Sequence, residues 1–249
     1  MTAHRLAIIP ARGGSKRLPG KNIYPFFGHP LLAYSVAAAV NSGLFERVIV
    51  STDDSHIGEI GAHYGGEFLP RPGEFANDVA PTAAVVLNVL ETLGRTSDSV
   101  CVLMPIAPLR TSQDVLEQYE LFEREQRLFQ ISVVRYRCVH PHWALQMDEQ
   151  GRGNWVFGDY LVPSQTLGIP YCPSGAVWWA RVPDLIEQRN FYGNPYHLAV
   201  IDGNRGIDID DKEDMELAEL IVRGLHEKHG TSPLESISQV PYMENPADE

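Results

Sequence analysis

The sequence contains few cysteines and no long apolar segment. Its three cysteines, Cys101, Cys138 and Cys172, are odd in number, widely spaced and never part of a Cys-x-x-Cys pair. This pattern predicts neither a disulfide framework nor a structural zinc site, and it favours reduced thiols in the cytoplasm. No apolar run approaches the roughly 18 residues that a membrane helix needs, and the N-terminus lacks the apolar region of a signal peptide. We therefore expect a cytoplasmic protein without a membrane partner.

Positive charge is also scarce. The chain has 20 lysines and arginines against 32 acidic residues, which gives a formal net charge of −12. A nucleic-acid-binding surface would be basic, so we expect no nucleic acid partner. Hydrophobic residues make up 44% of the 249 residues, which is typical of a globular protein with a full core. Against this acidic background, a local cluster of cations indicates an anion site.

Such a cluster lies in a glycine-rich loop. The hydrophobic run 6–9 stops abruptly and is followed by A-R-G-G-S-K-R-L-P-G-K-N at residues 11–22. Glycine lets backbone N–H groups approach an anion closely. The charge around it comes from Arg12, Lys16, Arg17 and Lys21. The spacing matches neither a Walker A loop nor a G-x-G-x-x-G turn. We predict a loop that holds a polyphosphate, in preference to a solvated basic loop.

Short apolar segments alternate with helical segments through the first half of the chain. We expect strands at 6–9, 47–51 and 99–104, and helices at 30–40, 54–64, 81–93 and 112–125. This alternation predicts an α/β fold with a Rossmann-like, mostly parallel sheet. Because ligands bind at the carboxyl ends of such strands, the loops at 10–22, 52–54, 71–82 and 104–111 should converge on one cleft.

The second half contains an irregular stretch. Residues 139–173 have no regular period and read as an insertion with a hairpin or short helix in a domain that spans 1–229. The pair His140 and His142 beside Trp143 could bind a metal, but without further metal-ligand spacing it is more typical of an interface loop. Regular structure returns at 176–180, with a helix near 183–189, a strand near 197–201 and a helix at 211–226. Residues 230–249 contain several prolines and no helical period, so we expect them to form a mobile tail.

A pair of aspartates precedes the last helix. In the sequence G-I-D-I-D-D at 206–211, Asp208 and Asp210 would project from the same side of an extended segment. Two adjacent carboxylates are stabilised by a cation, and their hard oxygen atoms suit Mg²⁺ shared with substrate phosphates. Asp211 would instead cap the helix. The alternative is that all three aspartates belong to a polar loop and a helix cap.

Five segments together resemble the acylneuraminate cytidylyltransferases, which make CMP-sugars. They are I-I-P-A-R-G-G-S-K-R-L-P-G-K-N at 8–22, V-I-V-S-T-D-D at 48–54, R-P-G-E-F-A-N-D at 71–78, P-I-A-P-L-R at 105–110 and G-I-D-I-D-D-K-E-D at 206–214. The resemblance covers roughly residues 4–225. It implies transfer of CMP from CTP to the anomeric hydroxyl of a nine-carbon 2-keto acid, with release of pyrophosphate.

The resemblance also implies roles for individual residues. Arg12, Lys16 and Lys21 would hold the triphosphate, helped by Gly13 and Ser15 of the same loop, and Asp208 and Asp210 would bind Mg²⁺. The residues that match the family's cytidine pocket are Ala11, Asn22, Arg71, Ala80 and Thr82. Asn22 and Arg71 carry hydrogen-bonding groups that can read a pyrimidine edge. As alternatives, Asn22 would be a loop cap and Arg71 a surface arginine.

On the sugar side we expect Met104, Arg110 and Ser174 to contact the substrate. Sialic-acid enzymes have glutamine where Met104 stands, and they carry arginine and asparagine around the later G-A motif, where this chain has C-P-S-G-A at 172–176. A more apolar pocket favours a deoxygenated or diacylamino sugar of the legionaminic or pseudaminic type. Two alternatives remain: a 3-deoxy-manno-octulosonate cytidylyltransferase and a catalytically inactive nucleotide-binding module.

The aromatic residues of the insertion suggest a homodimer. His140, His142, Trp143, Trp155, Phe157 and Tyr160 form more aromatic surface than a solvated loop normally carries. We expect the insertion to pack against its copy in a second subunit. The resemblance implies the same arrangement, in which the projecting element of one subunit helps to close the sugar site of the other.

Overall fold

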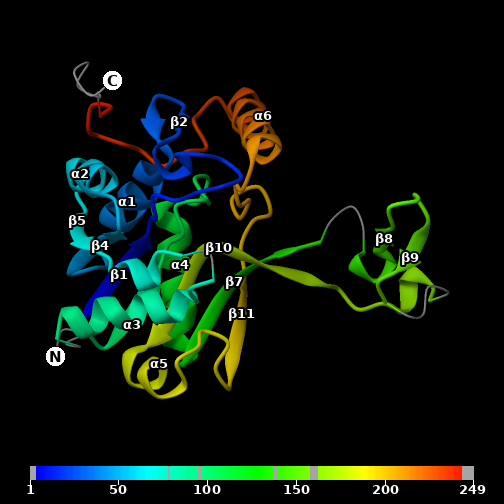
Figure 1. The fold of residues 1–249 in the computed structure, drawn as a ribbon, viewed down its shortest axis with the longest axis horizontal. Coiled ribbons are helices and arrows are strands. Elements are labelled where there is room, and N and C mark those ends of the chain that lie inside the picture. The colour runs from blue at the N-terminus through cyan, green and yellow to red at the C-terminus, as the bar shows by residue number, and fades with distance from the viewer. Residues whose placement is uncertain (1–3, 78, 95–96, 137–139, 158–161, 243–249) are drawn as a thin grey trace.

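The computed structural model describes residues 4–77, 79–94, 97–136, 140–157 and 162–242. A seven-stranded sheet forms the centre of this part of the chain (Figure 1), in the order β11-β7-β10-β6-β1-β4-β5. In chain order its strands are β1 (Arg5–Pro10), β4 (Arg47–Thr52), β5 (Glu67–Pro70), β6 (Ser99–Val102), β7 (Phe129–Arg135), β10 (Tyr171–Arg181) and β11 (Tyr196–Val200). Every neighbouring pair is parallel except those that involve β10, which is antiparallel to β6 and to β7. The predicted α/β fold with a mostly parallel sheet is confirmed.

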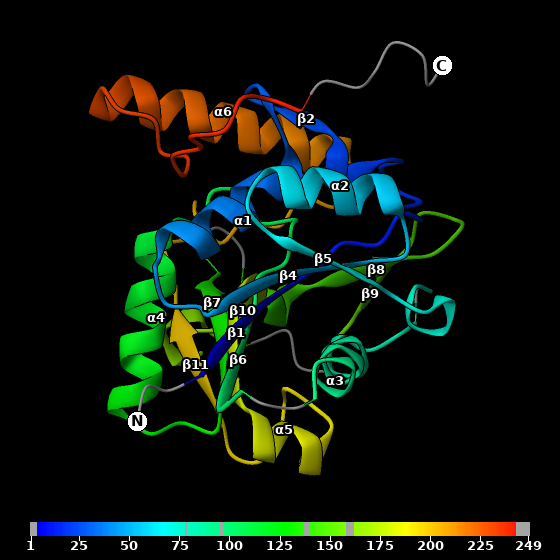
Figure 2. The same ribbon diagram turned by 90° about the vertical axis from the view of Figure 1, so that its left-hand side faces the viewer.

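Helices cover both faces of the sheet (Figure 2). They are α1 (Leu31–Asn41), α2 (Ser55–His63), α3 (Thr82–Thr92), α4 (Ser112–Arg124), α5 (Val182–Gln188) and α6 (Lys212–His229), with short 3-10 helices at Lys21–Ile23, Gly73–Phe75, Pro141–Trp143 and Ser164–Thr166. Alternate residues of β1 point to opposite faces, so Ala7 and Ile9 pack with α1, α2 and α4, while Leu6 and Ile8 pack with α3 and α5. A strand buried on both faces must be apolar throughout, which is why it was recognisable in the sequence.

Two strands of the seven-stranded sheet, β5 and β7, were not predicted from the sequence. β7 contains the buried polar residues Gln130 and Ser132, which interrupt its hydrophobic pattern. Both side chains are satisfied by hydrogen bonds: Gln130 Nε2 donates to the Gln118 carbonyl at 2.8 Å, and Ser132 Oγ donates to the Ser174 carbonyl at 2.9 Å. β5 is a short edge strand with mostly exposed side chains. Neither strand has the continuous apolar run on which the other predictions relied.

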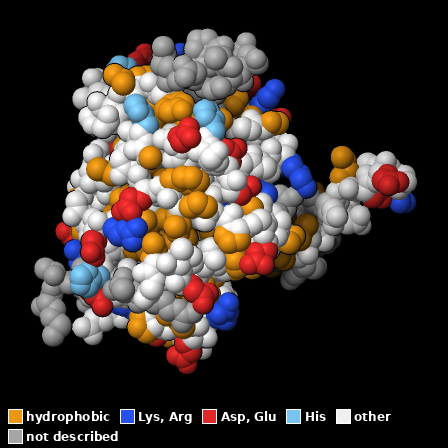
Figure 3. All heavy atoms as spheres, turned by 60° about the vertical axis from the view of Figure 1, so that its left-hand side comes forward, with side chains coloured by type: hydrophobic (Ala, Val, Ile, Leu, Met, Phe, Trp, Pro, Cys, Tyr) orange, Lys and Arg blue, Asp and Glu red, His pale blue; other side chains and the backbone are white. Residues whose placement is uncertain are grey.

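The irregular stretch forms a projecting element, as the sequence suggested. β7 and β10 extend beyond the body and carry a 3-10 turn and the two-stranded hairpin β8 (Leu145–Met147) and β9 (Gly153–Trp155), which stand clear of the body (Figure 3). His140 caps the 3-10 turn, because its ring accepts a hydrogen bond from the His142 N–H. Its Nε2 lies 3.1 Å from the Gly168 carbonyl oxygen. Cys138, Val139 and Tyr160 lie outside the described residues.

The segment that follows α6 lies against the body, whereas we expected a mobile tail from residue 230 onward. We call residues 231–242 the C-terminal strap. It runs beside α6 and β2 (Pro25–Phe26), the first strand of a small hairpin with β3 (His29–Pro30) (Figures 1 and 2). Its apolar side chains Leu234 and Ile237 pack against the core, which accounts for the difference. Residues 243–249 lie outside the described part. Among the described helices, none has both the length and the apolar character needed to cross a bilayer.

Candidate active site

A cavity of about 200 Å³ opens at the carboxyl ends of β1 and β6. Within the described residues it is lined by Pro10, Arg12, Ser15, Lys21, Asn22, Arg71, Phe75, Asn77, Ala80, Thr82, Val85, Met104, Pro105 and Ile106. All of them except Val85, which lies in α3, come from three of the four loops that were predicted to converge. The fourth, at 52–54, contributes Asp53, whose carboxylate accepts a hydrogen bond from Gly13 N–H at 3.0 Å. The predicted cleft is therefore present.

The glycine-rich loop is fixed to the sheet by backbone contacts. Ala11 N–H donates to the Ser51 carbonyl at 3.0 Å, so the loop continues the pairing of β1 with β4 before it turns away. Ala11 has a fully buried side chain and faces the core. Asn22 is also buried, and its amide donates to the Arg12 carbonyl at 2.8 Å. This bond ties the end of the loop to its start, the capping role that we weighed as the alternative for Asn22.

The loop cations divide into two groups. Arg12 and Lys21 line the cavity, whereas Lys16 and Arg17 are exposed on the outer part of the loop. Lys21 Nζ lies 2.9 Å from one carboxylate oxygen of Asp210, and Arg17 lies 2.8 Å from the other. The Lys21 side chain is only 13% exposed, so its ion pair is more shielded from water than that of Arg17, which is 67% exposed.

Arg71 lies almost buried in the wall of the cavity. Its guanidinium donates to the Ser51 carbonyl and lies 3.3 Å from the Ser51 hydroxyl. Burial lowers the pKa of Arg71 to about 10, while the charge of Asp53 opposes this shift and that of Arg12 adds to it. Arg71 therefore stays cationic at neutral pH and presents a fixed charge to the cavity, which excludes the surface-arginine alternative.

Asp208 is held by an irregularity in β10. The pairing of β10 with β7 shifts register between Pro173 and Trp178, and this shift turns the Gly175 N–H toward Asp208. Both Asp208 oxygens accept from that N–H, at 3.0 and 2.9 Å. Only glycine fits here, since a Cβ at residue 175 would lie 2.8 Å from the Met104 Cβ and 3.2 Å from Asp208 Oδ1.

The two aspartates have opposite electrostatic surroundings. Burial, together with the charge of Asp210, raises the pKa of Asp208 to about 6, against the hydrogen bond from Gly175 and the charges of Arg110 and Lys21. Burial would also raise the pKa of Asp210, but the hydrogen bond and charge of Lys21, with the charge of Arg17, hold it below its usual value. Asp211 caps α6 in a reciprocal arrangement with Asp214, as predicted. The charge of Asp208 is thus poorly balanced within the protein, whereas that of Asp210 is paired.

Two residues that we expected to contact the sugar lie behind the cavity wall instead. Arg110 is fully buried; it donates to the carbonyls of Ala176 and Met104 and to the Ser35 hydroxyl, at 2.9, 3.2 and 2.6 Å. Ser174 is also buried, and its carbonyl accepts from the Trp178 ring at 2.7 Å. Of the three expected contacts, only Met104 lines the cavity. The P-I-A-P-L-R motif borders the cavity through Pro105 and Ile106. Packing directs the Arg110 side chain of the same motif away from the cavity.

Several lining residues were not singled out from the sequence. Phe75 and Asn77 lie within the R-P-G-E-F-A-N-D motif, whose Asp78 is outside the described residues, so their position in that motif was the available signal. A second cavity, of about 430 Å³, adjoins the first at Thr82. It is lined by Pro81, Thr82, Ala83, Trp178, Arg189, Asn190, Phe191 and Tyr192. Residues 189–192 form a loop whose proximity depends on the tertiary fold.

The chain is similar to known nucleotide-sugar enzymes. A pseudaminic acid cytidylyltransferase from Campylobacter jejuni is 35% identical over 229 residues, covering 89% of this chain and 97% of the relative. A CMP-N,N'-diacetyllegionaminic acid synthase from Legionella pneumophila is 30% identical and covers 87% and 95%. An N-acylneuraminate cytidylyltransferase from Escherichia coli is 34% identical and covers 86% of this chain, which spans about half (51%) of that relative.

A solved structure and a family model complete the comparison. CMP:2-keto-3-deoxy-manno-octonic acid synthetase, solved in complex with CTP, superposes with a TM-score of 0.69 over 90% of this chain and 100% of that one, at 15% identity, which supports the fold alone. The model of a family described as cytidylyltransferase matches residues 6–134, more than half of the chain. The resemblance found in the five motifs is confirmed: the chain belongs to the cytidylyltransferase family.

Proposed function

We propose that this protein transfers CMP from CTP to the anomeric hydroxyl of a nonulosonic acid and releases pyrophosphate. The observation that carries this proposal is that Lys21, a cation that lines the cavity, forms an ion pair with Asp210 of the aspartate pair. Asp208 and Asp210 are not lining residues of the cavity, but this ion pair connects their segment to it. A nucleoside triphosphate entering the cavity meets Arg12, Lys21 and Arg71 in its wall. The similar enzymes named above act on sugars of this class, which supports the choice of acceptor.

The reaction joins the sugar oxygen to the α-phosphorus of CTP. The new P–O bond forms as the bond to the β-phosphate oxygen breaks, and the hydroxyl proton is lost. Such a displacement needs the two oxygens in line and the phosphate charge neutralised. Arg12, Lys16 and Lys21 neutralise the triphosphate in this proposal, and the wall formed by Arg71, Ala80 and Thr82 receives the cytidine. Gly13 and Ser15 belong to the same loop. Their N–H groups bond to the Asp53 carboxylate and to the Gly13 carbonyl, so each would have to exchange its partner to bind a phosphate.

The residues present fit a Mg²⁺ ion. Asp208 has a buried charge without a full counter-charge, as its raised pKa shows, and a cation would balance it. The described residues contain no group of three or more His, Cys, Asp or Glu side chains arranged for a metal, so Asp208 and Asp210 would share the ion with phosphate oxygens and water. When bound, Mg²⁺ polarises the phosphates. Phosphate would also draw Lys21 and Arg17 away from Asp210.

The surroundings of Met104 support a weakly polar sugar. Met104 lines the first cavity, and the adjoining cavity is bordered by Trp178, Phe191 and Tyr192. Apolar and aromatic walls suit the methyl and acylamino groups of pseudaminic or legionaminic acid better than the extra hydroxyls of sialic acid. We propose a diacylamino or deoxygenated acceptor of this type.

Homodimer formation and a cytoplasmic location are further parts of the proposal. The projecting hairpin exposes Leu145, Met147 and Trp155, with exposed fractions of 58%, 76% and 41%, which supports coverage by a second copy. Within the described residues Cys101 and Cys172 are both free thiols, in keeping with a reducing compartment.

Pyrophosphate release tests the proposal. The purified protein is incubated with Mg²⁺, CTP or UTP, and a panel of N-acetylneuraminic, pseudaminic, legionaminic and 3-deoxy-manno-octulosonic acids. We expect product with at least one nonulosonic acid and a preference for CTP of about 10²-fold, since a wrong base leaves buried polar groups unpaired. Turnover of the octulosonic acid alone favours the alternative of a 3-deoxy-manno-octulosonate cytidylyltransferase. CTP binding without any product favours the inactive module.

A further inference from the structure

The C-terminal strap packs against the apolar cluster on which the candidate active site rests. Leu234 and Ile237 of the strap border a buried cluster that contains Leu18, Leu109 and Ile209. Each of these three residues lies in a segment that borders the site: Leu18 in the glycine-rich loop, Leu109 beside the buried Arg110, and Ile209 between Asp208 and Asp210. Removing the strap would therefore expose the apolar support of three site segments at once.

Glu235 of the strap connects two helices. One carboxylate oxygen accepts a hydrogen bond from Asn41, the last residue of α1, at 2.9 Å. The other accepts from the backbone N–H of Ser112, the first residue of α4, where a negative charge also interacts well with the helix dipole. Asn41 donates in addition to the Ser236 carbonyl at 2.9 Å, so the strap is fixed at this point by both a side chain and its backbone.

The two helices joined by Glu235 hold Arg110. Ser35 of α1 accepts from the Arg110 guanidinium, and Arg110 lies just before Thr111, the N-cap of α4. Arg110 in turn bonds the carbonyl of Met104, whose N–H donates to Gly175, and Gly175 N–H binds Asp208. The negative charges of Glu235, Asp114 and Asp208 favour the cationic form of Arg110 against burial. A continuous set of contacts thus leads from the strap to a proposed metal ligand.

A second attachment keeps the strap in place. His63 Nε2 lies 2.7 Å from the Val240 carbonyl oxygen, and Tyr242 N–H donates to the Tyr64 hydroxyl at 3.1 Å. The same hydroxyl lies 3.0 Å from His29 Nδ1 in the β2–β3 hairpin. The hairpin follows directly after the glycine-rich loop, so this end of the strap is connected to the other side of the site.

We propose that Glu235 is a positioning residue, through which the C-terminal strap holds Arg110 and the Asp208 segment in the arrangement that binds CTP. The inference rests on the proposed function, because it concerns affinity for CTP. Glu235 does not touch the substrate in this proposal. It acts by fixing the start of α4, and with it the buried arginine behind the cavity wall.

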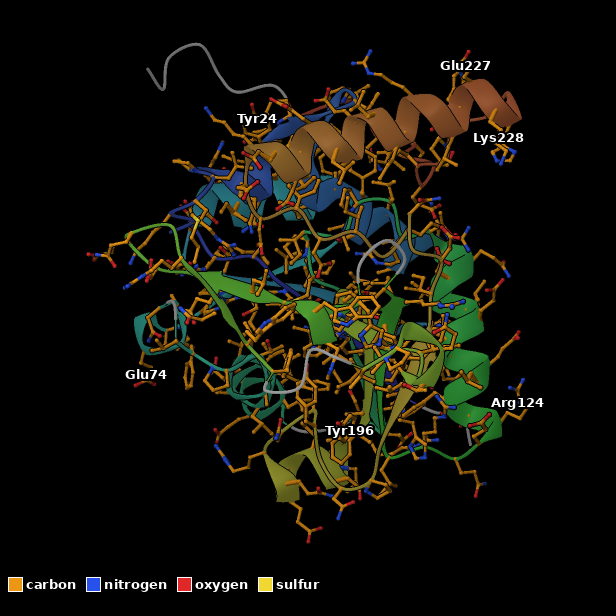
Figure 4. The ribbon with its side chains drawn as sticks, turned by 90° about the vertical axis from the view of Figure 1, so that its right-hand side faces the viewer. Tyr24, Glu74, Arg124, Tyr196, Glu227 and Lys228 are labelled. Carbon is orange, nitrogen blue, oxygen red and sulfur yellow. The ribbon has the colours of Figure 1, made fainter. Side chains whose placement is uncertain are left out.

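The test compares three variants of the full chain with the wild type: Glu235→Ala, Glu235→Gln and a chain that ends at Gly230. Glu227→Ala is the matched control, because Glu227 lies near the end of α6 and points away from the body (Figure 4). CTP affinity is measured by calorimetry with Mg²⁺, at a temperature where thermal unfolding shows every variant to be folded. KM for CTP and kcat are measured alongside.

We expect Glu235→Ala and the shortened chain to weaken CTP binding by about two- to tenfold, a range typical of residues that act through others. The Gln variant should recover part of this loss, since its amide oxygen can still accept from Ser112 N–H. Glu227→Ala should bind like the wild type. Equal CTP affinity in all folded variants overturns the inference but leaves the proposed function intact. A wild type that fails to bind CTP overturns the proposed function itself. If Glu235→Ala does not fold, the CTP affinity of Glu235→Gln is compared with that of the wild type. Weaker binding supports the inference, and equal binding overturns it.

Discussion

Lys21 Nζ and Asp210 Oδ1 lie 2.9 Å apart, although the two residues are separated by 189 positions in the chain. The ion pair joins the end of the glycine-rich loop to the segment before α6. Arg17 binds the second oxygen of the same carboxylate from a more exposed position. The pair links Lys21, which lines the cavity and is proposed to bind phosphate, to Asp210, a proposed metal ligand.

Replacing Lys21 should harm catalysis far more than replacing Arg17. Lys21 lines the cavity and is 13% exposed, so its charge acts at short range in a partly dry site, whereas Arg17 is largely solvated. We expect Lys21→Ala to lower kcat/KM for CTP by about 10²-fold and Arg17→Ala by less than about tenfold. Steady-state pyrophosphate release checks this. Equal effects of the two substitutions would contradict the division of the loop cations.

The three aspartates before α6 should respond differently to amide substitution. Asp208→Asn and Asp210→Asn remove proposed metal ligands and should lower kcat by about 10²-fold or more while the fold is retained. Asp211→Asn should be mild, because asparagine caps helices as well as aspartate does, and Asp211 serves as the N-cap of α6. Activity with Mg²⁺ and circular dichroism are the measurements. If all three variants had the same activity, the proposal that Asp208 and Asp210 bind the metal together, while Asp211 caps the helix, would be wrong.

Asp208 should make the metal-free protein less stable as the pH rises. Its pKa is about 6 in the folded chain and is raised by burial, so the protonated form fits the fold better than the charged form. The stability this gives is present in full below the ordinary pKa of an aspartate and is lost as the pH passes about 6. We expect Asp208→Asn to raise the free energy of unfolding in EDTA at pH 8 by up to about 3 kcal/mol, seen as a higher melting temperature, but to have little effect at pH 4. An equal gain at both pH values would refute this assignment.

Association should depend on the aromatic residues of the projecting element. Trp155 is 41% exposed on the hairpin, and Trp143 lies in the 3-10 turn that precedes it. If the element packs against its copy, Trp143→Ala or Trp155→Ala should weaken both dimerisation and sugar affinity but leave CTP binding unchanged. Sedimentation and calorimetry test this, with exposed Glu149→Gln as the control. A wild type that sediments as a fully active monomer would exclude the dimer.

Residue spacing along the chain was enough to predict the class of fold and the loops that meet at the candidate site. Buried strands of a parallel sheet are apolar throughout, so β1, β4 and β6 were recognisable, and the carboxyl ends of such strands meet at one edge. Local hydrogen bonding likewise determined the helix caps at Asp54 and Asp211. These features depend on residues close together in the chain, which is why spacing alone revealed them.

Which side chains reach the cavity depends on contacts between distant parts of the chain. Arg110 and Ser174 sit in motifs that border the site, yet packing between α1, α4 and β10 turns both inward. The Gly175 N–H faces Asp208 because of a register shift between β10 and β7. The buried polar residues Gln130 and Ser132 interrupt the apolar pattern of β7, so this strand was not recognisable in the sequence. The strap lies against the body through Leu234, Glu235 and Ile237, whose partners lie far away in the chain. Long-range contacts of this kind leave no periodic signal, because the partner's identity and distance are fixed only when the chain has folded.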